Sequence, residues 1–187
     1  MKAVHRGAPG RPDLHSLLDA AGVLAAELRQ LRGHFEALTA TYERDWVERE
    51  LAGYPAGATI PRYRQVPCAI WGELASPAGA TEVALLPTAH LNRGDRAVIS
   101  GGIDHPEQLA GRDGAAGAFL RDIDPQQHAL YLRGMPPQRS GWRLLQAWEC
   151  VPLASLLQMV RDIGEYARVM HREAVRRQRP STGSRAG

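Results

Sequence analysis

Apolar residues repeat at alternating steps of three and four in two stretches, one near each end of the chain. In the first stretch they are Leu14, Leu17, Ala21, Leu24, Leu28, Leu31, Phe35, Leu38 and Tyr42. In the second they are Leu153, Leu156, Val160, Ile163, Ala167, Met170 and Ala174. This is the spacing of the a and d positions of a helix that packs against other helices. The pattern therefore predicts two helices with apolar seams.

Start and stop signals set the bounds of both predicted helices. Asp13 stands directly before the first leucine, where a side chain that caps a helix N-terminus belongs, and Gly53 suits a helix C-terminus. The first helix is therefore predicted over 13–52. The second is predicted over 152–179, because a proline such as Pro152 is tolerated in the first helical turn, where its missing N–H would have no partner.

The two predicted helices differ in length, since about 38 residues of the first rise ~57 Å and about 26 residues of the second rise ~39 Å at 1.5 Å per residue. The shorter helix cannot cover the longer one, so about a third of the first seam needs another partner, either the middle of the chain or a second subunit. Glu27 and Arg32 lie at g and e positions, where they would pair between parallel chains. We therefore expect a homo-oligomer or a complex with a protein partner. The residues of this interaction seam are Leu14, Leu17, Leu24, Leu28, Leu31, Phe35, Leu38, Leu153, Leu156, Val160 and Ile163.

The first stripe changes face near its C-terminal end. The next seam position is Asp45, and the apolar residue has moved to Trp46. We expect Trp46, Val47 and Leu51 to leave the helical seam and to pack on the sheet.

Residues 54–151 hold most of the glycines and prolines and show short apolar runs, which are typical of strands and turns. The clearest predicted hairpin joins 82–86 to 96–100 through a turn at 92–95, and Pro87 places its first strand on a sheet edge. Further predicted strands are 68–71, 129–133 and 142–150, the last with Trp142, Leu144, Gln146, Trp148 and Cys150 on one face. Trp71, Trp142 and Trp148 are predicted to lie in the core.

The predicted fold class is α+β. A long N-terminal helix and a C-terminal helix pack together like a coiled coil, and a small antiparallel sheet is inserted between them. Residues 13–180 form a single domain, preceded by a flexible leader over 1–12 and followed by a disordered tail over 181–187. A hydrophobic content of 44% in 187 residues is sufficient for a core of this kind.

The composition argues against several classes of protein. No apolar run approaches the ~20 residues of a transmembrane helix, and the N-terminus lacks the apolar stretch of a signal peptide, so we expect a cytoplasmic, bacterial protein without a membrane partner. Cys68 and Cys150 lie far apart and form no CxxC pair, which argues against structural zinc. We predict no metal and no cofactor.

One polar cluster offers groups for chemistry. His90 and Asp95 flank the predicted hairpin turn, and Asp104 and His105 follow the hairpin. Imidazole and carboxylate groups together serve in general acid–base catalysis and in divalent-metal sites. The same residues also suit a turn, a helix cap and an exposed surface, so the sequence leaves both interpretations open.

Arginines line the outer face of the second predicted helix. They are Arg161, Arg168, Arg172, Arg176 and Arg179. Guanidinium groups opposite an apolar seam can follow the phosphates of a nucleic acid. Arg62 and Arg64 flank Tyr63, a combination suited to stacking on unpaired bases. A solvated helix face explains the same arginines without any nucleic acid.

Together these patterns favour a non-catalytic assembly or accessory protein that associates with itself or with another protein through its helical seams. Its basic helix would provide a contact to nucleic acid. One alternative is a small hydrolase or metal-dependent enzyme that uses the His/Asp cluster. Another is a protein whose main role is sequence-independent binding of RNA or DNA.

Overall fold

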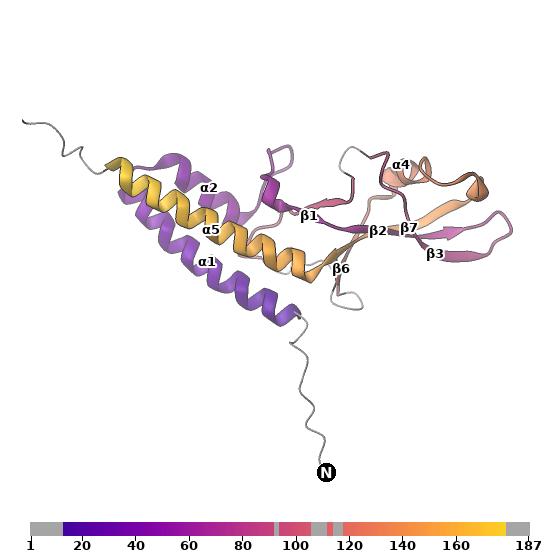
Figure 1. Cartoon of the computed structure of the whole chain (residues 1–187), viewed down its shortest axis with the longest axis horizontal. Helices are drawn as coiled ribbons and strands as arrows, with labels where there is room; N and C mark the ends of the chain where they lie inside the picture. The colour runs from indigo at the N-terminus through magenta and orange to yellow at the C-terminus, as the bar shows by residue number, and fades with distance from the viewer. Residues whose placement is uncertain (1–12, 92–93, 106–111, 114–117, 179–187) are drawn as a thin grey trace, which may run out of the picture. The chain divides into compact units, whose positions relative to one another are not determined.

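The computed structural model describes residues 13–91, 94–105, 112–113 and 118–178, and the chain divides into two compact units (Figure 1). The sheet unit takes its described residues from Met1–Leu18, Pro67–Ala97 and Ala110–Leu156. The helical unit takes its described residues from Asp19–Val66, Val98–Leu109 and Leu157–Gly187.

Three long helices account for most of the helical structure: α1 (Leu14–Ala37), α2 (Thr41–Ala52) and α5 (Leu153–Gln178). The start of α1 follows the predicted capping residue, because Asp13 Oδ1 accepts a hydrogen bond of 2.8 Å from the backbone N–H of Ser16. This hydrogen bond and one from the Ser16 hydroxyl lower the pKa of Asp13 below its usual value. The start predicted for the C-terminal helix agrees with that of α5, and its predicted end at 179 lies outside the described residues.

Within the helical unit, α1 and α5 lie side by side and run in the same direction (Figure 1). Contacts between them join Glu27 to Arg168, His34 to His171 and Leu38 to Gln178. Residue numbers rise together along both helices from one contact to the next, so the packing is parallel. Glu27 therefore pairs within its own chain.

The prediction of one helix over 13–52 is wrong. The chain breaks between α1 and α2, where Thr39 has a φ of 51° and the N–H of Ala40 donates a hydrogen bond of 2.9 Å to the carbonyl of Phe35. The chain then reverses, and α2 runs antiparallel to α5, since Glu43 pairs with Arg177 and Trp46 contacts Tyr166.

This break also removes the expected difference in length. The helix α1 has 24 residues and α5 has 26, so neither leaves a third of its seam uncovered. The predicted change of face at Trp46 falls within α2, after the break. Trp46, Val47 and Leu51 are buried, and Trp46 packs edge-on against the ring of Tyr166 in the helical unit, with centroids 5.2 Å apart, where packing on the sheet was predicted.

Most of the predicted seam is buried within the single chain. The buried seam residues are Leu17, Leu24, Leu28, Leu31, Phe35, Leu153, Leu156, Val160 and Ile163. Leu38 is half-buried, and Leu14 is exposed. The seam therefore forms part of the protein's own core.

The sheet unit contains a five-stranded antiparallel sheet in the order β3-β2-β7-β6-β5. Its strands are β2 (Ala69–Ala75), β3 (Thr81–Leu85), β5 (Arg112–Asp113), β6 (Ala118–Asp122) and β7 (Arg143–Pro152). A separate two-stranded sheet pairs β1 (Gln65–Pro67) with β4 (Arg96–Val98). The short helices are η1 (Arg62–Arg64), η2 (Pro125–Gln127), α4 (His128–Leu132) and η3 (Pro137–Arg139). The predicted α+β class and the small antiparallel sheet are confirmed.

Two details of the predicted sheet are wrong. Residues 82–86 do not pair with 96–100, because β3 pairs with the preceding β2 and β4 pairs with β1. A tight turn favours the nearer partner: the N–H of Ser76 donates a hydrogen bond of 2.8 Å to the carbonyl of Ala80. Residues 129–133 are mostly helical, because they follow the one-turn helix η2 that Asp124 caps. The predicted turn at 92–95 lies partly outside the described residues.

A β-bulge changes the predicted faces of β7. Glu73 pairs with Gln146 and Leu74 with Leu144, so Leu145 is an extra residue in the ladder. Beyond this extra residue, the alternation of the β7 side chains between the two faces of the sheet is shifted by one position. The buried residues of this strand are Leu144, Ala147, Glu149 and Val151. Trp71, Trp142 and Trp148 were all predicted to lie in the core, but each of them is only half-buried.

Candidate functional site

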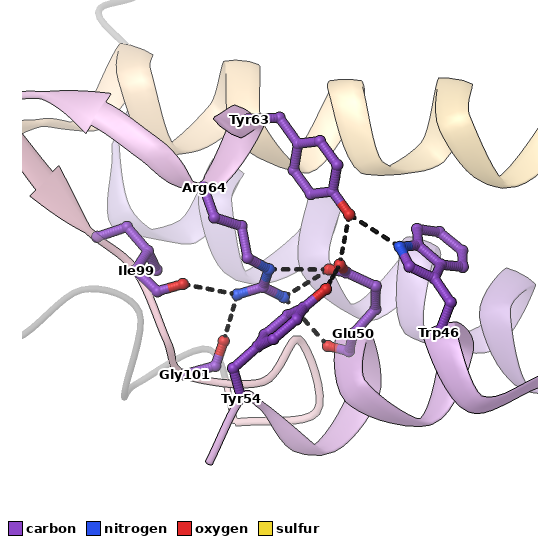
Figure 2. A network of polar contacts seen from close by, with 7 residues as sticks. All are labelled: Trp46, Glu50, Tyr54, Tyr63, Arg64, Ile99 and Gly101. Carbon is purple, nitrogen blue, oxygen red and sulfur yellow. Dashed lines mark hydrogen bonds and ion pairs between the residues drawn. The ribbon is translucent and has the colours of Figure 1, made fainter. Parts of the chain in front are cut away.

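A buried ion pair forms the polar centre of the helical unit (Figure 2). Glu50 lies in the last turn of α2, and Arg64 ends η1. Both side chains are 0% exposed, with Arg64 Nη2 2.6 Å and Arg64 Nε 2.9 Å from Glu50 Oε2. Both nitrogens of one edge of the guanidinium thus donate to the same carboxylate oxygen, which gives the pair a fixed geometry.

The remaining donors of Arg64 are also engaged. Its Nη1 donates to the carbonyl oxygens of Ile99 at 3.0 Å and Gly101 at 2.6 Å, and its Nη2 also donates to the carbonyl of Glu50 at 3.3 Å. A guanidinium has five N–H groups, and these contacts use all of them. The ion pair therefore joins the end of α2, η1 and the segment 99–101.

Aromatic side chains complete this polar network, as Figure 2 shows. Glu50 Oε1 accepts hydrogen bonds from the Tyr54 hydroxyl at 2.5 Å and the Tyr63 hydroxyl at 2.7 Å. The indole N–H of Trp46 donates to the Tyr63 oxygen at 2.9 Å. Burial, followed by the charge and hydrogen bonding of Glu50, raises the pKa of both tyrosines. Both phenols therefore remain neutral donors, and their hydrogen bonds tie Tyr54 and Tyr63 to the carboxylate of Glu50.

The sequence pattern does not predict this network. Glu50 stands in a run of alternating charges typical of an exposed helix face, and Arg64 was predicted to contact nucleic acid. That prediction is wrong, because a fully buried guanidinium with all donors engaged cannot reach a phosphate. The only local hint was the pair of tyrosines, Tyr54 and Tyr63, near the end of the predicted helix.

The arginines of α5 lie at the surface of the helical unit. Arg161, Arg168, Arg172 and Arg176 are exposed, as is Arg62. Arg168 is held by Glu27, with Nε 3.1 Å from Oε1. Arg177 of the same helix pairs with Glu43. Within the described residues no carboxylate lies in ion-pairing distance of Arg161, Arg172 or Arg176. The remaining predicted member, Arg179, lies outside the described residues.

The His/Asp cluster is distributed over both units. His90 belongs to the sheet unit, and its Nε2 lies 2.7 Å from the carbonyl oxygen of Leu130. Asp95 lies in the same unit. Asp104 and His105 belong to the helical unit, where Asp104 pairs with Arg29 at 2.6 Å. In the described part of the chain, no group of three or more His, Cys, Asp or Glu residues is placed to hold a metal ion.

One face of the sheet carries an apolar surface that the sequence pattern did not predict. Leu85, Trp71 and Trp148 stand opposite one another on the neighbouring strands β3, β2 and β7, and Val83 stands opposite Glu73 in the adjacent row. Val83 and Leu85 are 59% and 58% exposed, and both tryptophans are half-buried. We call Trp71, Val83, Leu85 and Trp148 the apolar sheet face.

This surface arises from the bulge in β7. The buried face of the sheet takes Ile70, Leu74, Ala147 and Val151, so the tryptophan of β7 has to point to the opposite side. Bulges cannot be located from alternation alone, because the sequence pattern on either side of the inserted residue remains regular.

The fold and these surfaces define a mixed α+β protein with a polar network in its helical unit and an exposed apolar face on its sheet. The AbiTii family model matches residues 14–165, from the start of α1 into α5. The chain therefore belongs to the AbiTii family, an abortive-infection family. Comparisons with curated proteins and with solved structures found no match. Among the described helices, none has the length and apolar character that a membrane crossing requires.

Proposed function

We propose that the chain is a non-catalytic accessory protein of a bacterial abortive-infection system, and that it acts by protein–protein assembly through the apolar sheet face. The observation that carries this proposal is the exposure of Val83 and Leu85 beside Trp71 and Trp148. Contiguous exposed apolar side chains favour burial against a partner, and tryptophan is enriched in the centres of protein interfaces.

Site-specific photo-crosslinking in bacterial cells tests this proposal. A benzoylphenylalanine at position 85 should give an adduct of one defined mass, and the additional change Val83→Glu should abolish it because a carboxylate then enters the contact. The control places the same probe at Val169, a partly exposed valine of α5. Absence of an adduct at position 85, or equal adducts at both positions, would contradict the proposal.

A second candidate function is nucleic-acid binding by the helical unit. It is supported by the exposure of Arg161, Arg172 and Arg176, which lack carboxylate partners among the described residues. Fluorescence anisotropy with a labelled single-stranded oligonucleotide is the test. Three phosphate contacts predict an affinity that falls about twentyfold between 50 and 200 mM salt. Arg172→Gln with Arg176→Gln should reduce this salt dependence, whereas Arg44→Gln, at an arginine paired with Asp45, should not. An affinity independent of salt would exclude this function.

A further inference from the structure

Among the described strands, β3 forms one outer edge of the five-stranded sheet. It is the outermost strand in the order β3-β2-β7-β6-β5, and its described pairing is with β2. The N–H of Leu86 donates to the carbonyl of Ile70 opposite it. Along an antiparallel strand, the N–H and C=O groups of successive residues point alternately toward one neighbouring strand and toward the other side. Since those of Leu86 point toward β2, the backbone groups of Thr81, Val83 and Leu85 point away from β2. An edge of this kind can pair with another strand.

The edge lacks the usual protection against such pairing. Natural edge strands carry lysines, prolines or bulges, and residues 81–85 contain none of these. Their one charged residue, Glu82, lies opposite Leu74, on the buried face of the sheet, and pairs with Arg139 of η3. The side chains of Val83 and Leu85 on the other face are exposed. Both the outward backbone groups of β3 and its exposed side chains are thus accessible to an added strand.

We infer that the partner of this edge is β3 of a second copy of the chain, paired antiparallel about a two-fold axis at Val83. This inference rests on the proposed function, because pairing at this edge places the apolar sheet faces of the two copies side by side. In this register Val83 stands opposite Val83 of the second copy, Thr81 opposite Leu85, and Glu82 opposite Ala84. The outward-facing residues then form three hydrogen-bonded pairs, each of which exchanges two hydrogen bonds.

Charge and proline select this register over its neighbours. A two-fold axis at Glu82 would set two carboxylates directly opposite each other, which is destabilising. An axis at Ala84 would set Thr81 opposite Pro87, which has no N–H to donate. The axis at Val83 avoids both, and it joins the two apolar sheet faces into one surface. The strand is therefore complementary to itself in one register.

The oligomeric state of the full-length protein tests this inference. In sedimentation velocity at about 10–100 µM, the wild type should be a dimer. Leu85→Lys should be a monomer with an unchanged circular dichroism spectrum, since the side chain is exposed and its charge blocks the edge. The matched control Val169→Lys should remain a dimer. A monomeric wild type, or a Leu85→Lys variant that dimerises like the wild type, would overturn the inference.

A cysteine variant tests the register itself. In a Cys150→Ser background, Val83→Cys should form a disulfide-linked dimer on mild oxidation, because the Cα atoms of a hydrogen-bonded pair lie about 5.5 Å apart, within the range that a disulfide spans. Val169→Cys should not. If the purified chain is monomeric and yields no linked dimer, while the probe at position 85 still captures a different protein in cells, the second copy is excluded and the proposed function stands. If that probe captures nothing either, both fail.

Discussion

Removing the charge of Glu50 should strongly destabilise the protein. In Glu50→Gln the fully buried guanidinium of Arg64 keeps its three carbonyl acceptors but loses the carboxylate that neutralises it. Breaking a buried ion pair by removing one partner costs about 3–5 kcal/mol. For a chain of this size each kcal/mol lowers the melting temperature by about 2–4 °C. We therefore expect the melting temperature to fall by roughly 6–20 °C.

A double-mutant cycle separates the ion pair from other effects. Urea unfolding followed by circular dichroism should show that Glu50→Leu with Arg64→Met loses less stability than the sum of the two single changes, because no unpaired charge remains buried. The matched control is Glu48→Gln, two residues away on α2, whose carboxylate is 53% exposed and lies 4.0 Å from Arg44. This exposed pair is worth at most about 1 kcal/mol. Equal losses for Glu48→Gln and Glu50→Gln, or strict additivity in the cycle, would refute the reasoning.

Two further predictions concern the polar network and a close backbone contact. Tyr54→Phe and Tyr63→Phe should each cost about 1.5–3 kcal/mol in urea unfolding, because each removes a hydrogen bond to a carboxylate. Burial raises the pKa of both tyrosines above their ordinary value of 10.0. Near pH 10 these two tyrosines then ionise only in the unfolded state, so the free energy of unfolding of the wild type should fall as the pH rises above 10. In the double phenylalanine variant it should fall less steeply. Parallel plots of unfolding free energy against pH for the two proteins would contradict this. Gly102→Ala should cost about 3 kcal/mol or more, because its Cβ would lie 2.1 Å from the carbonyl oxygen of Leu51. Gly22→Ala, with nothing within 4 Å, should gain about 1 kcal/mol in thermal unfolding, and a similar loss in both alanine variants would contradict the steric argument.

The candidate surfaces were predicted less well than the fold. The exposed arginines of α5 follow from helical periodicity, because the buried seam fixes which side of the helix faces solvent. The apolar sheet face did not follow from the sequence, since it depends on the bulge at Leu145 and on which strands are neighbours of Trp71. The role of Arg64 was predicted incorrectly for a similar reason: its neighbours in the chain say nothing about Ile99 and Gly101, which accept its hydrogen bonds.

The sequence by itself determined the start of α1 directly after Asp13, the start of α5, and the apolar residues that the helices bury. These features depend on residues within one or two helical turns, so local spacing contains the information. Tertiary structure decided that the chain reverses after Ala37, that α1 and α5 run parallel, and that Glu50 meets Arg64. These features depend on which distant segments together bury the most apolar surface and satisfy the most polar groups, and no local pattern records that choice.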